Sequence, residues 1–414
     1  MRGEHLHRAR GKLHPPRQRK RRAGRSRYPQ AVEQRRQEEL DLDIPSGKTL
    51  LIDGPASVKL VEGKGHIYGC PLRPRQTYVL RPWKRYPLYA EKDVKIELNL
   101  GADAEATLAE TGEEYAAWRE IVENIGERAA LAVCGGVDTG KTSFATFAAN
   151  MFVQRLGRCV VVGLDPGQTS FTPPCVVGCA LLREPVHDLT GLTAFLQRPV
   201  GSPSAALCAA EIAEAAREIA QAVSSEAYVV DVDGWVEGPV AVAHKVALVK
   251  LLNCSHVVLM GENKPLAEAL SQTGVEVFTA PISRHIKQRE TATRRKTREW
   301  LYRKHLAKTR TRLIPYSWVK LFTFCGQMSP QELVKQADEA LAQTRQENSE
   351  NKKRGLIAFL YDGADRYRGM GLLTGFNEEK RVYMVLTAVE DEVRKIGLGR
   401  VILTEDGDEV LQLD

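Results

Sequence analysis

The fold is decided by the stretch Gly135-Gly136-Val137-Asp138-Thr139-Gly140-Lys141-Thr142. An apolar run over residues 129–134 precedes it and is typical of a buried parallel strand. Behind it, residues 143–156 carry apolar side chains at helical spacing. A strand, a glycine-rich loop and a helix in this order can curl backbone N–H groups around a phosphate chain. The stretch therefore predicts an α/β domain with an anion site at its first loop.

The side chains of this stretch add a second argument. Lys141 can reach the β- and γ-phosphates of a nucleotide, and the Thr142 hydroxyl can ligate Mg²⁺. A chance glycine turn is the alternative, but the complete pattern between a strand and a helix favours a Walker A motif. We expect a nucleoside triphosphate to be held by Gly135, Gly136, Val137, Asp138, Thr139, Gly140, Lys141, Thr142 and Ser143.

Composition narrows the class of protein. The chain of 414 residues has ordinary apolar and charged fractions for a globular protein. It carries no apolar run of bilayer length and no hydrophobic signal region, so we expect no membrane association. Its eight cysteines are scattered, which indicates a reducing compartment and argues against a metal site at Cys175 and Cys179. The expected location is the cytoplasm, or the nucleus if the source is a eukaryote.

The net charge of +7 is unevenly distributed. Residues 1–37 hold thirteen Lys and Arg against two Glu, a local charge of +11, which leaves −4 for the rest. We expect a basic, disordered arm over residues 1–46. Two interpretations of it remain open, a solvated tail and an electrostatic arm for nucleic acid.

The rest of the chain divides by its pattern. Residues 47–110 and 354–414 contain short alternating strands, which predict two small all-β domains. Residues 111–328 alternate strands and helices, which predicts a doubly wound, mostly parallel sheet. Residues 329–353 are predicted to form a helix and a polar linker. The expected fold is therefore an α/β P-loop domain flanked by N- and C-terminal β domains.

Two aspartates follow predicted strands of the central sheet. Asp165 comes after the strand 159–164, and Asp231 ends an apolar strand as in a Walker B segment. A lone Asp at such a place is usually a turn or cap residue. Two of them beside a P-loop favour an active site, because ligands sit at the carboxyl ends of parallel strands. We expect Thr142, Asp165 and Asp231 to hold Mg²⁺, and Asp165 could instead reach an attacking hydroxyl.

A second basic segment spans residues 284–312. It contains twelve Lys and Arg but only two acids, Glu290 and Glu299. A solvated helix face is the ordinary interpretation of such charges, but so few acids allow little pairing and favour phosphate contact. Trp300 and Tyr302 lie within it and are either core residues or stacking platforms.

The segment Asn263-Lys264-Pro265-Leu266 follows a strand as a guanine-binding motif does, but Leu266 cannot replace the carboxylate that reads guanine. We therefore discount a GTPase. An ATP-driven motor or partitioning ATPase would leave the basic segment and both β domains unexplained.

Five motifs in one order carry a resemblance. They are the loop 135–142, Asp165-Pro166-Gly167-Gln168, the segment 200–204, the segment 231–236 and the segment 294–299. Together they resemble the polynucleotide 5′-hydroxyl kinases of RNA processing. The likeness covers about residues 47–414. Asp233 departs from the family, since a small hydroxyl residue is expected before Gly234-Trp235, and the segment 200–204 looks shorter than the family's.

The resemblance implies a function and a site. It implies transfer of the γ-phosphate of ATP, with Mg²⁺, to the 5′-OH end of RNA or DNA, and RNA-processing proteins as partners. The alternative is an RNA-processing scaffold in which ATP is structural and turnover negligible. The implied catalytic residues are Lys141, Asp165, Arg294, Arg295 and Arg298. The implied acceptor-binding residues are Gln168, Gly201, Ser202, Pro203 and Trp235.

Overall fold

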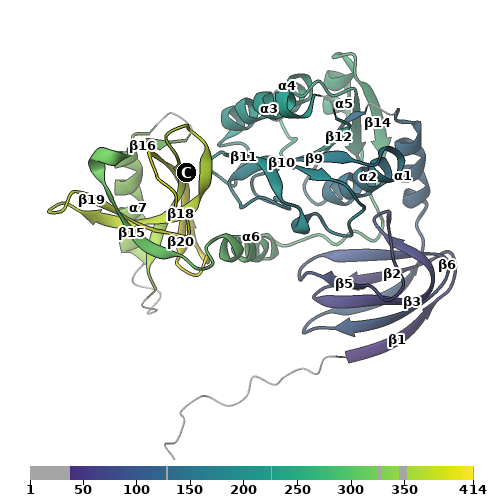
Figure 1. Ribbon diagram of the computed structural model, residues 1–414. Coiled ribbons are helices and arrows are strands. Elements are labelled where there is room, and N and C mark those ends of the chain that lie inside the picture. Colours follow the sequence, from purple (N-terminus) through teal and green to yellow (C-terminus); the bar gives the residue numbers. More distant parts are fainter. Residues whose placement is uncertain (1–37, 127–128, 225, 325–327, 345–351, 414) are drawn as a thin grey trace, which may run out of the picture. The chain divides into compact units, whose positions relative to one another are not determined.

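The computed structural model describes residues 38–126, 129–224, 226–324, 328–344 and 352–413 (Figure 1). The chain divides into two units, 1–36 and 37–414. Residues 1–37 of the basic arm predicted over residues 1–46 lie outside the described residues. All elements below belong to the second unit.

The N-terminal sheet is antiparallel throughout. Its central strand is the long β6, Arg85–Leu100, which pairs with β1, β2 and β3. Side chains alternate between buried and more exposed along much of β6, so one face packs a core that includes Val58, Tyr86 and Leu98. The other strands are β1 (Glu38–Ile44), β2 (Lys48–Asp53), β3 (Ala56–Ile67), β4 (Cys70–Pro71), β5 (Thr77–Leu80) and β7 (Glu105–Glu110).

The pairing of β1 with β6 corrects one expectation. Residues 38–44 were assigned to the basic arm, but each of them lies opposite a residue of β6 in the sheet. The alternation of Leu40, Leu42 and Ile44 with charged residues is the period-2 signal of a half-buried strand. The N-terminal β domain therefore starts at residue 38 and not at residue 47.

The central sheet has the strand order β11-β10-β9-β12-β8-β13-β14. The five strands from β9 to β14 in this order are parallel, and β10 and β11 form an antiparallel edge. The fold class predicted from the sequence is confirmed. The strands are β8 (Ala130–Gly135), β9 (Cys159–Leu164), β10 (Val176–Leu182), β11 (Ala194–Pro199), β12 (Tyr228–Val232), β13 (His256–Met260) and β14 (Glu276–Ala280).

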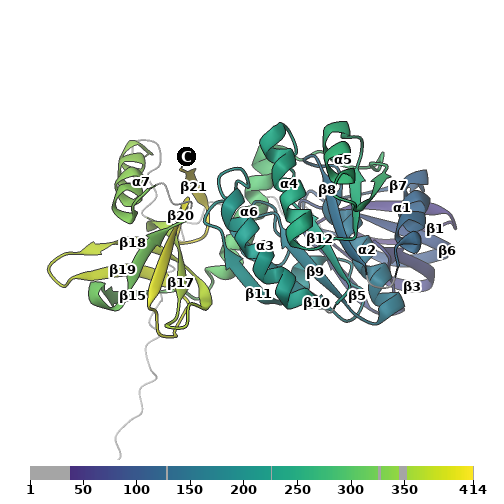
Figure 2. The same cartoon turned by 90° about the horizontal axis from the view of Figure 1, so that it is seen from above.

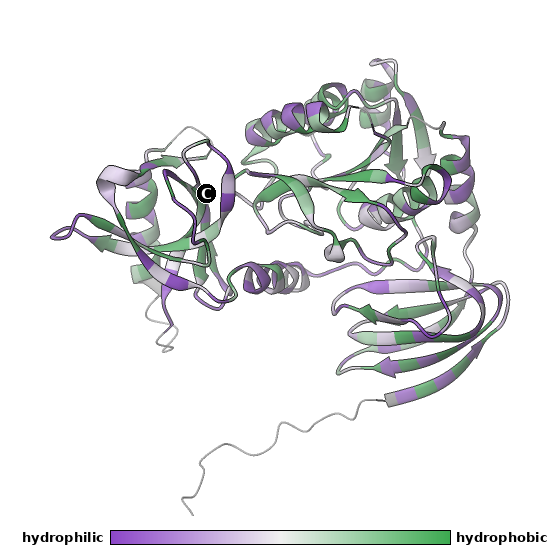
Figure 3. Ribbon diagram, viewed as in Figure 1, coloured by the Kyte–Doolittle hydropathy of each residue, from purple (hydrophilic) through white to green (hydrophobic). Residues whose placement is uncertain are grey.

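Helices cover both faces of this sheet. On one face α1 (Glu113–Asn124) and α2 (Lys141–Leu156) bury Trp118, Phe144 and Phe152. On the other face lie α3 (Ala209–Val223), α4 (Pro239–Leu251) and α5 (Lys264–Ser271). The short 3-10 turn Leu189–Gly191 lies elsewhere in the domain. Figure 2 shows α3 and α4 side by side. The strands between these layers are apolar along almost their whole length (Figure 3), as parallel strands buried on both faces require.

The C-terminal sheet corrects a second boundary. The strands β15 (Arg310–Pro315) and β16 (Lys320–Thr323) pair with β19 and β20, so residues 310–323 belong to this sheet and not to the P-loop domain, which we expected to extend to residue 328. The helix α7 packs on the same sheet through Leu333 and Ala337. The remaining elements are α7 (Pro330–Thr344), β17 (Arg354–Tyr361), β18 (Tyr367–Asn377), β19 (Val382–Thr387), β20 (Lys395–Thr404), β21 (Glu409–Gln412) and the 3-10 turn Tyr316–Trp318.

The helix α6, Thr291–His305, carries six of the twelve Lys and Arg of the basic segment. The sequence leaves two interpretations of Tyr302 open, a core residue and a stacking platform. The structure supports the core residue, because Tyr302 is fully buried against Cys175. The seven cysteines in the described part of the chain are free and buried. No helix among the described residues has the length and apolar character to cross a bilayer.

Candidate functional site

The P-loop joins β8 to α2 through backbone conformations that favour glycine. Gly135 has φ 153° and Gly140 has φ 91°, both in the range that L side chains rarely adopt. A Cβ at Gly135 would also lie 2.8 Å from Thr139 Oγ1. In this structure Lys141 Nζ donates to the Gly136 carbonyl oxygen at 2.7 Å. The loop therefore has the geometry of an anion cradle at a helix N-terminus.

The strand order brings the two predicted aspartates beside this loop. β12 lies between β8 and β9, and Asp231 is in register with Gly163 near the end of β9. The loop after β9 carries Asp165, whose Oδ1 accepts hydrogen bonds from the backbone N–H groups of Gly167 at 2.9 Å and Gln168 at 2.8 Å. Burial raises the pKa of the Asp165 carboxyl, and the nearby charge of Asp233 adds to that rise.

Asp231 and Thr142 have the chemistry of a Mg²⁺ site. Thr142 Oγ1 donates to Asp231 Oδ2 at 2.7 Å, while Asp231 Oδ1 is buried without a hydrogen-bond partner among the described residues. An unpaired buried carboxylate oxygen is costly unless a ligand satisfies it. Burial raises the pKa of Asp231 to about 6, against the opposing effects of Thr142 and Lys141. Oxygen ligands of this kind, completed by phosphates and water, fit Mg²⁺.

Asp233, the departure noted in the sequence, has a local partner. Its Oδ2 accepts from Lys245 Nζ at 2.6 Å, and both side chains are buried, with 4% and 0% of their surfaces exposed. Its Oδ1 accepts from the backbone N–H of Trp235 at 2.9 Å. Gly234 lies against the P-loop so closely that a Cβ there would meet Val137 Cγ2 at 2.8 Å. The pair therefore fixes the loop that carries Trp235 beside the P-loop.

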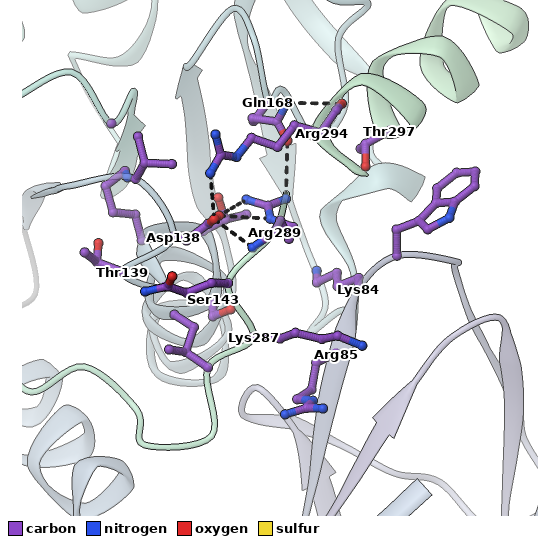
Figure 4. A pocket seen from close by; sticks show the side chains of 18 of the residues that line it. Lys84, Arg85, Asp138, Thr139, Ser143, Gln168, Lys287, Arg289, Arg294 and Thr297 are labelled. Atoms are coloured by element: carbon purple, nitrogen blue, oxygen red, sulfur yellow. Dashed lines mark hydrogen bonds and ion pairs between the residues drawn. The ribbon is translucent and has the colours of Figure 1, made fainter. Parts of the chain in front are cut away.

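The basic segment divides into two groups. Figure 4 shows Arg289 and Arg294 turned toward Asp138 of the P-loop, and both bind its carboxylate. Arg295 and Arg298 instead bind Glu409 at the start of β21: Arg298 Nη2 donates to its Oε2 at 2.8 Å, and Arg295 donates to its backbone carbonyl. Of the three arginines predicted to act together, the structure brings Arg294 to the P-loop and ties the other two to the C-terminal sheet.

The acceptor candidates also divide. Gln168, Pro203 and Trp235 line one cavity with the P-loop and Asp165. Gly201 and Ser202 lie behind it: the Gly201 carbonyl accepts from the backbone N–H of Arg400 in β20 at 2.8 Å, and Ser202 is buried. Of the residues expected to bind the acceptor, these two are absent from the described cavity lining.

Sequence reasoning missed five Lys and Arg residues that line the cavity: Arg81, Lys84, Arg85, Lys287 and Arg289. Arg289 and Lys287 were part of the basic segment, but nothing in its pattern singled them out. Lys84 and Arg85 come from the N-terminal β domain; Arg85 binds both oxygens of Asp53 at 2.8 Å, and Lys84 binds Asp188 at 3.0 Å. The only sequence signal was the cluster of Arg81, Lys84 and Arg85 between two strands.

The cavity has a volume of about 1150 Å³. This is slightly above the range of about 300–1,000 Å³ that is usual for sites of small ligands. It is lined by the P-loop, the loops after β9 and β12, the start of α6 and part of the N-terminal sheet. An arrangement of this size and charge can hold a triphosphate together with the end of a second substrate.

Comparisons with known proteins agree with this geometry. Residues 135–308 match the family described as mRNA cleavage and polyadenylation factor CLP1 P-loop. A polyribonucleotide 5′-hydroxyl-kinase of Thermococcus kodakarensis is 27% identical over 319 residues, which are 68% of this chain and 90% of that protein. A CLP1 homolog of Nematostella vectensis is 23% identical over 327 residues, 70% of this chain and 74% of that protein.

Solved structures show the same fold. The structure of a wild-type Clp1p–Pcf11p complex matches with a TM-score of 0.66 and 17% identity, over 87% of this chain and 97% of that one. A second structure, of an extended interface between Pcf11p and Clp1p, matches with a TM-score of 0.64 and 17% identity, over 87% and 98% of the two chains. Residues 135–308 therefore match the CLP1 P-loop family model, and the proteins similar to this chain include ones named polyribonucleotide 5′-hydroxyl-kinase and CLP1 homolog.

Proposed function

We propose that this chain is a polynucleotide 5′-hydroxyl kinase that uses ATP and Mg²⁺. The observation that supports it best is the shared cavity, which places Lys141, Asp165 and Arg294 around one space. A carboxylate and an arginine that face the same phosphate site suit proton acceptance and charge neutralisation during phosphoryl transfer. The names of several relatives, polyribonucleotide 5′-hydroxyl-kinases at 21–27% identity over about 70% of this chain, support the same reaction.

The phosphates are the first part of the mechanism. The loop amides and Lys141 bind the β- and γ-phosphates of ATP. Mg²⁺, when bound, supplies further neutralisation of phosphate charge, and Thr142 and Asp231 are the residues that would hold it.

The transfer step then follows from the remaining residues. The 5′-hydroxyl oxygen attacks the γ-phosphorus, a new P–O bond forms, and the bond from that phosphorus to the β–γ bridging oxygen breaks to release ADP. Asp165 accepts the hydroxyl proton, for which a carboxylate with a raised pKa is suited. Arg294 neutralises the charge that develops on the transferred group.

The acceptor end is proposed to lie against Gln168, Pro203 and Trp235. Trp235 offers a half-buried indole on which a terminal base can stack. Stacking is tolerant of sequence, so RNA and DNA ends of any base should bind. A protein partner in RNA processing is proposed as well, because the solved relative Clp1p is in complex with Pcf11p.

The test offers γ-labelled ATP and Mg²⁺ with 5′-hydroxyl oligonucleotides of RNA and of DNA. We expect label on the oligonucleotide, and none on an oligonucleotide of the same sequence that already carries a 5′-phosphate. The matched control protein is Lys141→Ala. If the wild-type chain binds ATP but labels neither nucleic acid, the kinase proposal is wrong and the scaffold with structural nucleotide is the better account.

A further inference from the structure

Asp138 occupies an unusual position in the P-loop. Its backbone has φ 56°, in the left-handed region, and only 6% of its side-chain surface is exposed. The carboxylate points away from its own loop toward the start of α6 (Figure 4). Burial alone would raise the pKa of this carboxyl, but hydrogen bonds and charge from Arg289 and Arg294 lower it by more. Asp138 is therefore a charged group that bridges the loop and the basic segment.

The two arginines that meet at Asp138 are used differently. Arg289 donates to this carboxylate through its backbone N–H at 2.9 Å, through Nε at 3.0 Å and through Nη2 at 2.9 Å. Its Nη1 donates to Gln168 Oε1 at 3.3 Å. Its backbone N–H and three of its five guanidinium N–H groups therefore connect the basic segment to the two loops of the cavity.

Arg294 keeps donors for a ligand. Its Nη2 donates to Asp138 Oδ2 at 3.0 Å, while its Nε is buried without a partner among the described residues. A buried guanidinium N–H without an acceptor carries a desolvation penalty that a phosphate oxygen would relieve. Arg294 lies in the cavity lining, so such an oxygen can reach it.

Electrostatics at the start of α6 explain why an acid is needed here. The helix begins at Thr291, and the backbone N–H of Arg294 donates to the Glu290 carbonyl. A helix N-terminus carries partial positive charge, which disfavours a nearby guanidinium. Two arginines there, facing Lys141 in the same cavity, would repel one another without a carboxylate between them. Asp138 supplies that charge from the P-loop itself.

We infer that Asp138 is a positioning residue, which through Arg289 clamps the start of α6 to the P-loop and aims Arg294 at the transferred phosphoryl group. The inference rests on the proposed kinase function for its catalytic consequence, but the clamp itself does not. In this account the P-loop performs two tasks: its backbone and Lys141 bind phosphate, and its acid sets the place of the catalytic arginine.

The decisive variant is Asp138→Asn. Asparagine has the same size and tolerates the left-handed backbone, so the loop conformation is retained while the charge is lost. We expect kcat to fall by about 10-fold to 10²-fold, since small displacements of a catalytic group have costs of this order. The KM for ATP should change little, because Lys141 and the loop amides remain in place.

Further variants separate positioning from catalysis. Arg289→Ala should lower kcat as Asp138→Asn does, and the loss in the double variant should be less than the sum of the two single losses, because Asp138 and Arg289 share a contact. Arg289→Lys should recover part of the loss. Lys296→Ala, which removes an exposed cation of α6 outside the cavity lining, is the matched control and should leave kcat unchanged.

Hydrogen exchange of residues 284–294 provides a readout independent of turnover. Asp138→Asn should speed this exchange, and Lys296→Ala should not. If wild-type chain transfers no phosphate, the kinase proposal fails, and the exchange result alone decides on the clamp. Unchanged exchange overturns the clamp, and so does a kcat equal to that of wild type within error. A rise in KM for ATP at constant kcat would make Asp138 a nucleotide-binding residue and overturn its positioning role.

Discussion

Arg298 of α6 and Glu409 of β21 form a two-pronged ion pair, with Nε to Oε1 at 2.5 Å and Nη2 to Oε2 at 2.8 Å. Both side chains are largely buried, with 12% and 4% of their surfaces exposed. The pair attaches the basic helix to the C-terminal sheet. Arg298 is thus an anchor of α6, and because it also lies in the cavity lining, its catalytic role stays a prediction.

The first prediction concerns this anchor. Arg298→Ala should lower the free energy of unfolding by about 3–5 kcal/mol, because it leaves the Glu409 carboxylate buried and uncompensated. The matched control is Arg303→Ala on the same helix, whose pair with Asp408 is more exposed and should contribute less than about 1 kcal/mol. Urea unfolding of the three proteins measures both values. Equal losses in the two variants would contradict the anchor.

The second prediction separates binding of phosphate from folding. Lys141→Ala should reduce phosphate transfer by at least about 10²-fold, as the loss of a charge that stabilises the transition state does in comparable sites. Its melting temperature should match wild type, because Lys141 Nζ donates only within the loop, to Gly136. Transfer assays check the predicted loss of activity, and thermal melting checks the unchanged stability. Near-normal phosphate transfer by this variant would show that the P-loop lysine is not needed for the reaction.

The third prediction concerns the base of the nucleotide. Asn263 caps α5 by accepting from the backbone N–H of Leu266 at 3.1 Å, and Leu266 is fully buried. Asn263 and Leu266 therefore belong to the start of a helix, and neither is among the described residues that line the cavity. We therefore expect no preference for GTP over ATP. Competition of each unlabelled nucleotide against labelled ATP is the measurement, and selective displacement by GTP would reverse the conclusion.

The fourth prediction concerns pH. Asp188 binds Arg81 and Lys84 of the N-terminal domain, each at 3.0 Å. Burial raises the pKa of Asp188, but the charges of Lys84 and Arg81 lower it by more, to well below its usual range. Because the folded-state pKa is depressed, the stabilisation is present above the unfolded value of about 3.9 and is lost as the pH falls below it.

Asp188→Asn should therefore unfold at lower urea concentration than wild type at pH 7, and the difference should shrink as the pH falls through the acid range. Unfolding curves measured from pH 7 downward check this. Asp391→Asn, which alters an exposed pair with Arg368, is the control and should leave the pH dependence unchanged. If the stability difference between Asp188→Asn and wild type were the same at every pH, stability would not be coupled to protonation of Asp188.

Local patterns in the sequence predicted the centre of the fold well. The strand, glycine loop and helix around Lys141 are contiguous, and the apolar strands before Asp165 and near Asp231 are buried on both faces. Each of these patterns involves residues that are adjacent in the sequence, so it can be recognised before the fold is known. The antiparallel strands β10 and β11 were not predicted, because they form an edge whose pairing is set by tertiary contacts.

The assignment of the arginines needed the fold. From the sequence, Arg294, Arg295 and Arg298 share one implied catalytic role, and the scarcity of nearby acids favoured phosphate contact over ion pairing. The partners of Arg294 and Arg298, Asp138 and Glu409, come from segments 156 and 111 residues away. Sequence periodicity cannot predict ion pairs between residues so far apart in the chain. For the same reason the pocket residue Lys84 escaped prediction, whereas β1 carried a local alternating pattern that the basic composition of the preceding residues obscured.

The most direct measurement of the central claim is the position of the transferred phosphate. A 5′-hydroxyl RNA oligonucleotide incubated with the wild-type chain, ATP and Mg²⁺ should gain one phosphoryl group by mass spectrometry, with one ADP formed for each oligonucleotide modified. Digestion to nucleotides should place the group on the 5′-terminal residue, and Asp165→Asn should form little of this product. An oligonucleotide of unchanged mass in the presence of bound ATP, or ADP released without modified RNA, would contradict the account.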